Sequence, residues 1–235
     1  MKVLFVGNSH TFFNDMPQML SVFGKARGMD IFVVQNTSGG RGLDWQANQF
    51  DVRFNVLFGG YDYIVMQHIA HPFGGEEELL QSAGNLMQYV SRSDAAPIAF
   101  LPWSEENNPQ GQALLNEAHN ALVKAHPSIK IAPIGLVWDK VRNENPEIQL
   151  YYSDGEHAAP HGSWLIAATI FRTITGETAA GLPSVVELGR PTYAGLTMEV
   201  DGRNITFTQD WNALTCYDLD PVACGIIARA IDSCV

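Results

Sequence analysis

The chain has 235 residues, 14 of them basic and 25 acidic, which gives a net charge of −11 at neutral pH. This length and composition are typical of a globular protein that buries enough surface to fold without disulfides, so we expect a single domain over residues 1–235. The negative charge repels phosphate backbones and anionic lipid and therefore argues against nucleic acid and membrane surfaces as partners.

The cysteine pattern and the first residues bear on the cellular compartment. Cys216, Cys224 and Cys234 are an odd, clustered set that matches no zinc-binding spacing. Such a set argues against a disulfide framework and favours a reducing compartment. Residues 1–7 are too short for the apolar part of a signal peptide and predict a strand instead. We expect a cytoplasmic protein, with export of a trimmed precursor as the alternative.

Runs rich in β-branched and aromatic residues alternate with helical patterns in the first three quarters of the chain. The expected strands lie at residues 2–6, 31–35, 62–66, 98–101 and 130–134. The expected helices lie at residues 17–27, 43–57, 76–92, 110–125 and 160–176. In the second helix the spacing predicts one buried face, formed by Leu43, Ala47, Phe50, Phe54 and Leu57.

Strands that alternate with helices need crossover connections, which predict a parallel sheet covered by helices on both faces. We therefore expect an α/β fold, a three-layer α/β/α sandwich with a flavodoxin-like, mostly parallel five-stranded sheet. Its core spans about residues 1–176. The region 183–235 is an appendage, in which residues 196–208 alternate at period two around Asp201-Gly202 and predict a β-hairpin. A final helix is expected at about residues 221–232.

Candidate catalytic residues fall in two loops. Open parallel sheets bind ligands at the carboxyl ends of their strands, and Ser9 follows the first strand at that edge. A serine needs a base to take its proton and a third group to orient the base. Asp154 and His157 share one short loop and are suited to those two roles. Each segment alone is also typical of an ordinary polar turn.

The two loops together resemble a known family. Gly7-Asn8-Ser9 after the first strand, with Asp154-Gly155-x-His157-x-x-Pro160-x-Gly162 further along, is similar to the motifs of SGNH/GDSL hydrolases. The resemblance covers about residues 1–176 and implies a three-layer esterase, lipase, thioesterase or carbohydrate deacetylase that needs no cofactor. It implies that Ser9 is the nucleophile, His157 the base and Asp154 its acidic partner.

The resemblance also implies an oxyanion hole. The Ser9 amide and a glycine amide would hold the oxyanion, and we expect Gly40, with Gly39 as the alternative. Many members supply an asparagine from a Gly-x-Asn-Asp block after the third strand, but the matching stretch here contains Gln67. Gln67 is the candidate for that donor. The departure marks a divergent branch.

Three further residues are candidates for substrate binding, namely His10, His68 and Trp103. An aromatic face near the serine suits a sugar ring or an apolar acyl chain, although Trp103 is equally consistent with core packing. The expected reaction is hydrolysis of a small-molecule carboxylic ester, with a short acyl group such as acetyl on a carbohydrate as the preferred substrate. The oligomeric state is left open.

Two other functions stay open at this point. A non-catalytic domain that binds a small molecule or carbohydrate could keep the same fold. A metal-dependent hydrolase could use His68 and His71, His157 and His161, and the Asp154 carboxylate as ligands. Their spacing matches no established metal motif, so we expect no metal site.

Overall fold

The structure, a computed structural model, describes residues 1–188, 197–200, 203–206 and 215–235. Its main feature is a five-stranded parallel sheet in the order β2-β1-β3-β4-β5. The strands are β1 (Lys2–Gly7), β2 (Phe32–Thr37), β3 (Tyr63–Met66), β4 (Ala96–Phe100) and β5 (Lys130–Ala132). In register, Val3 of the interior strand β1 pairs with Val33 of β2 and with Tyr63 of β3.

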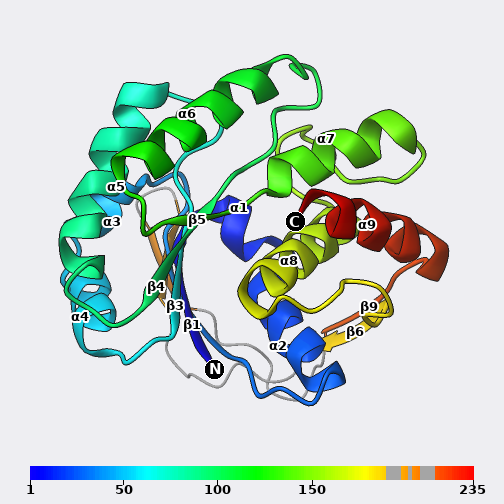
Figure 1. The fold of residues 1–235 in the computed structure, drawn as a ribbon, viewed down its shortest axis with the longest axis horizontal. Helices are drawn as coiled ribbons and strands as arrows, with labels where there is room; N and C mark the ends of the chain where they lie inside the picture. Colours follow the sequence, from blue (N-terminus) through cyan, green and yellow to red (C-terminus); the bar gives the residue numbers. More distant parts are fainter. Residues whose placement is uncertain (189–196, 201–202, 207–214) are drawn as a thin grey trace.

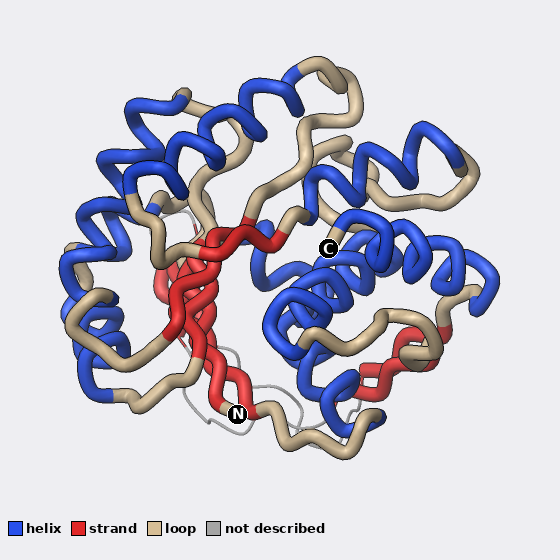
Figure 2. The backbone as a smooth tube through the Cα atoms, viewed as in Figure 1, coloured by secondary structure: helices blue, strands red, loops and turns tan. Residues whose placement is uncertain are grey.

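Helices cover both faces of this sheet (Figures 1 and 2). One layer contains α3 (Leu43–Ala47), α4 (Phe50–Phe58), α5 (Glu76–Val90) and α6 (Gly111–Ala125). The other contains α2 (Met16–Ala26), α7 (Ile134–Glu144), α8 (Pro160–Thr175) and α9 (Pro221–Cys234). Alternate β1 residues face opposite layers: Val3 and Phe5 join one core, and Leu4 and Val6 join the other. The predicted three-layer α/β/α sandwich is confirmed.

The predicted helix over residues 43–57 is wrong in its continuity and in its buried face. The chain forms two helices, α3 and α4, and the Arg53 side chain donates to the Ala47 carbonyl where α3 ends. The break changes the helical phase, so α4 buries Val52 and Val56. Its phenylalanines point outward, and Phe50 is 85% exposed.

The predicted strand over residues 130–134 is also shorter in the structure. β5 ends at Ala132, and Ile134 begins α7, a helix that the sequence analysis did not predict. Ile134, Val137, Trp138 and Val141 are all buried on its inner face. Their spacing is that of an amphipathic helix. The helix follows β5 so closely that the composition of this stretch does not show where the strand ends.

The C-terminal region contains more strand than expected. β7 (Thr197–Val200) and β8 (Arg203–Thr206) pair antiparallel, which confirms the hairpin, although its predicted turn at Asp201-Gly202 lies outside the described residues. In addition, β6 (Val185–Leu188) pairs antiparallel with β9 (Thr215–Asp218). Val186 and Leu188 are buried in the same core as α2 and α8, so this part of the appendage belongs to the main hydrophobic core.

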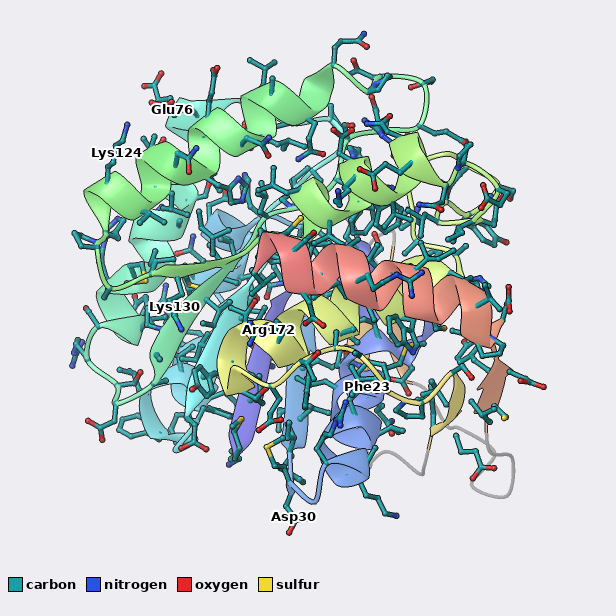
Figure 3. All side chains as sticks on the ribbon, turned by 45° about the vertical axis from the view of Figure 1, so that its right-hand side comes forward. Phe23, Asp30, Glu76, Lys124, Lys130 and Arg172 are labelled. Carbon is teal, nitrogen blue, oxygen red and sulfur yellow. The ribbon has the colours of Figure 1, made fainter. Side chains whose placement is uncertain are left out.

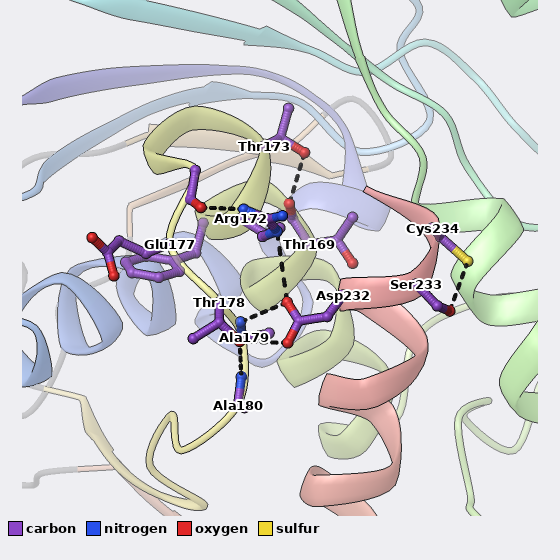
Figure 4. Close-up of polar contacts among 12 residues, drawn as sticks. Thr169, Arg172, Thr173, Glu177, Thr178, Ala179, Ala180, Asp232, Ser233 and Cys234 are labelled. Carbon is purple, nitrogen blue, oxygen red and sulfur yellow. Dashed lines mark hydrogen bonds and ion pairs between the residues drawn. The ribbon is translucent and has the colours of Figure 1, made fainter.

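The layer formed by α2, α8 and α9 is joined by aromatic packing and by polar contacts. The Phe23 ring of α2, labelled in Figure 3, packs edge-on against Trp164 of α8. At the far end of α8, Asp232 of α9 accepts a hydrogen bond from the Ala179 N–H at 3.0 Å and pairs with Arg172 at 3.6 Å (Figure 4). These contacts fix α9 against the end of α8.

Within the described part of the chain, none of the helices has the length and apolar character needed to span a bilayer.

A short segment leads from β1 into α2 and has unusual backbone. It consists of α1 (Ser9–Phe12) and a single 3₁₀ turn (Phe13–Asp15), in which Asn14 and Asp15 have φ values of 55° and 52°. Such left-handed backbone is uncommon for residues with a Cβ and is favoured at functional sites. Burial raises the pKa of the Asp15 carboxyl to about 6, although a hydrogen bond from Gln18 opposes this shift.

Replacing Asp15 by Asn should therefore stabilise the protein in a pH-dependent way. Above pH 6 the wild-type fold holds a buried carboxylate, whereas below about pH 4 the group is protonated both folded and unfolded and the penalty vanishes. Asparagine retains an oxygen for Gln18 and tolerates left-handed backbone. Thermal melts should show a higher midpoint for Asp15→Asn at pH 8 and a shrinking difference as the pH falls to 4. An equal difference at both pH values would contradict this explanation, and exposed Asp94→Asn is the control.

Candidate active site

Asn8 fixes the position of Ser9 at the carboxyl end of β1. The Asn8 side chain accepts a hydrogen bond from the His10 N–H at 3.1 Å and caps α1. Its amide also donates to the Arg41 carbonyl at 3.1 Å, which ties the loop after β2 to the start of α1. The backbone around Ser9 is therefore held from two neighbouring strands.

Ser9, His157 and Asp154 form one hydrogen-bonded chain. The His157 Nε2 atom lies 2.8 Å from the Ser9 Oγ atom, and His157 Nδ1 lies 2.8 Å from Asp154 Oδ2. The loop that carries His157 turns through Gly155, whose φ of +74° is left-handed. The structure thus brings together the three residues that the sequence predicted, across 148 positions of chain.

The Asp154 carboxylate is held in its ionised form. Burial opposes ionisation, but hydrogen bonds from the backbone N–H groups of Glu156 and His157 and from the His157 ring outweigh it and lower the Asp154 pKa below its usual value. An ionised carboxylate accepts a hydrogen bond from the Nδ1–H of His157 and so leaves the lone pair of Nε2 directed at Ser9. This is the arrangement in which a histidine can take a proton from serine.

A second set of contacts holds the loop of His157 against the segment that follows Ser9. The Asn14 side-chain amide donates to the Ala158 carbonyl and to the Ser163 hydroxyl, both at 2.9 Å. Ser163, in the first turn of α8, donates in turn to the Phe13 carbonyl. Asn14 adopts its left-handed backbone where it makes these contacts. The sequence analysis missed this role, because only the folded chain brings Asn14 beside residues 158–163.

Gly40 lies in the loop that Asn8 ties to the nucleophile. It has a φ of +66° inside the turn from Ser38 to Arg41, and a Cβ added there would meet open space. Its left-handed backbone explains why glycine stands here, and the open space leaves room for a ligand to approach. Of the two glycines considered, Gly40 is the one in this conformation.

Gln67, the candidate oxyanion donor, makes its polar contacts within the protein. Its side chain is fully buried, and its amide nitrogen donates to the neighbouring His68 carbonyl. Its oxygen accepts from the Asn8 N–H at 2.9 Å and from the Thr11 hydroxyl at 3.1 Å. In this structure the polar atoms of Gln67 therefore contact the end of β3 and Asn8, the residue before Ser9, and the role of Gln67 as an oxyanion donor stays a prediction.

The three candidates for substrate binding are buried as well and make contacts within the protein, so their role in substrate binding stays a prediction. His68 accepts from the Leu43 N–H and its other nitrogen lies 3.3 Å from Glu78. Trp103 is fully buried, stacks on Trp138 at 4.1 Å between ring centroids, and donates its indole N–H to a backbone carbonyl. His10 is 5% exposed and packs against the His157 ring.

Of the histidines considered as metal ligands, His68, His71 and His157 make hydrogen bonds within the protein, whereas His161, in the first turn of α8, has a buried Nε2 atom without a partner. His71 lies 3.0 Å from the His10 ring and 3.0 Å from the Trp103 carbonyl, and so does not face His68 across a shared site. Across residues 1–188 and the other described segments, no three His, Cys, Asp or Glu side chains lie close enough to hold a metal ion together. The arrangement supports proton transfer between Ser9 and His157 rather than ligation.

Comparison with known proteins identifies the fold. No protein-family model matches the sequence, and no curated protein matches it. Among solved structures, a DUF4886 family protein from Bacteroides uniformis is 17% identical and has a TM-score of 0.74, over 99% of this chain and 93% of that one.

Two smaller structures match the larger part of the chain. An acetyl xylan esterase is 15% identical with a TM-score of 0.59, over 74% of this chain and 100% of that one. A member of the lipolytic G-D-S-L family from Veillonella parvula is 13% identical with a TM-score of 0.57, over 74% of this chain and 98% of that one. The chain therefore has the three-layer fold of the SGNH/GDSL hydrolases that its motifs resemble.

Proposed function

We propose that the protein is a serine esterase that hydrolyses a carboxylic ester through an acyl-enzyme. The observation that carries this proposal is the hydrogen-bonded chain from Ser9 Oγ through both ring nitrogens of His157 to Asp154. A serine, a histidine and an orienting carboxylate in this order are typical of hydrolases that form a covalent acyl-enzyme, and this supports the proposal.

In the first half-reaction, His157 Nε2 takes the Ser9 proton as Ser9 Oγ attacks the ester carbonyl. Asp154 stabilises the imidazolium that forms. The backbone N–H groups of Ser9 and Gly40 are the proposed donors to the tetrahedral oxyanion, since the amide of Gln67 donates to the His68 carbonyl. When the intermediate collapses, His157 returns the proton to the leaving alcohol.

In the second half-reaction, His157 removes a proton from water, which attacks the acyl-enzyme carbonyl. The same donors hold the second oxyanion, and the collapse releases the acid and restores the Ser9 hydroxyl. Each proton that His157 accepts is given back within the same half-reaction, so no external cofactor enters the cycle.

For the substrate, we propose a short acyl ester, with acetyl on a carbohydrate as the preferred case. The support is indirect. One structure of this fold is an acetyl xylan esterase, and others are an esterase inhibited by monoethylphosphonate and a lipase/acylhydrolase. Those activities belong to those proteins. A panel of acetyl, butyryl and octanoyl p-nitrophenyl esters, followed by acetylated xylan, would test the preference.

Replacing Ser9 by Ala should abolish both turnover and labelling. Without the hydroxyl no acyl-enzyme forms, so p-nitrophenyl acetate hydrolysis should fall by about 10³-fold or more. A fluorophosphonate probe should label the wild type at Ser9 and leave the variant unlabelled. Ser91, exposed at the end of α5, provides the matched Ser91→Ala control. Undiminished hydrolysis by Ser9→Ala would refute the proposed mechanism.

Replacing Asp154 by Asn should slow the reaction while leaving the fold in place. An amide does not hold the proton on His157 Nδ1, and the wrong imidazole tautomer lowers kcat by about 10⁴ in serine proteases. We expect a decrease of several orders of magnitude in kcat with a melting temperature close to that of exposed Asp94→Asn. A parallel loss of stability and activity would show that Asp154 acts mainly in the loop structure.

Replacing Gln67 by Ala tests whether this buried amide supports the fold or the transition state. The change leaves the Asn8 N–H without its acceptor, so the free energy of unfolding should fall by about 1–3 kcal/mol. The folded fraction should keep a kcat well above the loss of about 10²–10³ seen when an oxyanion donor is removed. Unchanged stability with a loss of that size would restore Gln67 to the oxyanion hole.

A further inference from the structure

The imidazole of His157 lies against two other rings. The Phe13 ring is nearly parallel to it, with 4.1 Å between centroids and 15° between planes. The His10 ring also stacks on it, with a centroid distance of 4.9 Å and an interplanar angle of 22°. Both rings belong to the segment that directly follows Ser9. The plane of His157 is thus set by side-chain packing as well as by its hydrogen bonds.

His10 is itself fixed by a hydrogen-bonded chain of imidazoles. Its Nε2 atom lies 3.0 Å from His71 Nδ1, and His71 Nε2 lies 3.0 Å from the Trp103 carbonyl. A carbonyl only accepts, so the His71 proton resides on Nε2. Neutral His71 then presents a lone pair at Nδ1, which accepts the Nε2–H of His10. The Trp103 carbonyl therefore sets the tautomer of His71, and through the 3.0 Å contact His71 favours the Nε2–H form of His10. The Nδ1 atom of His10 lies at a longer 3.3 Å from the Asn8 Oδ1 atom, which already accepts from the His10 backbone N–H.

The same pair is kept uncharged by its surroundings. Burial lowers the pKa of His10 well below its usual value, and the nearby His71 and His157 rings lower it further, while Asp154 opposes them. Burial also lowers the pKa of His71 and His157 adds to this, against the Trp103 carbonyl and the carboxylates of Glu105 and Glu156. At neutral pH, His157 therefore packs against neutral His10.

Neutrality of His10 matters because His157 becomes an imidazolium during the proposed reaction. A protonated His10 at this distance would repel that charge, since like charges disfavour ionisation of a neighbour. The face of the Phe13 ring carries partial negative charge and attracts a cation. The packing around His157 thus favours both the correct ring plane and the charged state that proton transfer creates.

We propose that His10 and His71 form a neutral imidazole pair that positions His157 for proton transfer from Ser9. His10 is the direct support of the catalytic ring, and His71 fixes the tautomer and place of His10. The proposal rests on the esterase function proposed above, and it makes both histidines positioning residues that never touch the substrate.

Two substitutions at His10 separate a positioning role from general stability. His10→Ala removes the supporting ring, and misplacement of a reacting group by about 1 Å can cost 10²-fold. We expect kcat with p-nitrophenyl acetate to fall by about 10- to 100-fold with KM nearly unchanged. His10→Phe restores a flat neutral ring and should recover most of kcat, although it lacks the hydrogen bond to His71. His126→Ala, at the end of α6, is the control.

Equal losses of kcat in the Ala and Phe variants would overturn the proposal, as would full activity in His10→Ala. Fluorophosphonate labelling rates should follow the same order, because labelling depends on activation of Ser9 and not on release of a product.

NMR of ¹⁵N-histidine-labelled protein tests the pair without turnover. At pH 7 we expect His10 and His71 to be neutral Nε2–H tautomers. In the wild type, His157 should give one sharp set of ring signals. These His157 signals should be displaced or broadened in His10→Ala and should stay sharp in His10→Phe. A charged ring, an Nδ1–H tautomer or unchanged His157 signals in His10→Ala would overturn the proposal. A wild type that shows the expected signals but neither turnover nor labelling would refute the esterase function and leave the positioning of His157 standing.

Discussion

The hydrogen bond between His157 Nε2 and Ser9 Oγ is the contact on which the proposed function depends. It joins segments 148 residues apart at 2.8 Å. Ser9 is placed by the interior strand β1, which is buried on both faces. His157 is placed by a loop that leads into α8, which packs on the same layer as α2. The two side chains meet only because α8 and the segment after β1 are fixed to the same part of the core.

Contacts directly beside the site also fix the positions of Ser9 and His157. A misplacement of one ångström at either end would lengthen the bond beyond useful reach. The left-handed Asn14, held by the Ala158 carbonyl and the Ser163 hydroxyl, ties the two segments directly beside the site. A residue keeps strained backbone of this kind where contacts with its surroundings hold it in place. Here the surroundings are the strand end on one side and the first turn of α8 on the other.

The sequence predicted the sheet, its flanking helices and the Ser9, Asp154 and His157 set, because each depends on a short-range pattern. Alternating hydrophobic runs define the strands, and the motif residues lie a few positions apart in two loops. The sequence did not predict how the side chains of Gln67 and Trp103 are placed. Both follow strands at the functional edge, but residue type does not reveal whether a polar or aromatic side chain at that edge turns toward a ligand or back into the protein. Gln67 turns back to the Asn8 N–H, and Trp103 turns back to stack on Trp138.

Gln67 and Trp103 still influence the site, because each forms a hydrogen bond with a backbone group next to His157 or Ser9. Trp103 donates its indole N–H to the carbonyl of Glu156, the residue before His157, and its own carbonyl accepts from His71. Gln67 accepts from the N–H of Asn8, the residue before Ser9. Each half of the proposed catalytic pair is therefore supported at the preceding residue by a hydrogen bond to a buried side chain. Buried donors and acceptors are costly to leave unpaired. The free-energy cost of breaking these hydrogen bonds therefore also opposes any shift of Ser9 relative to His157. This coupling explains why polar residues at the functional edge of a sheet can be essential to its geometry without ever meeting a ligand.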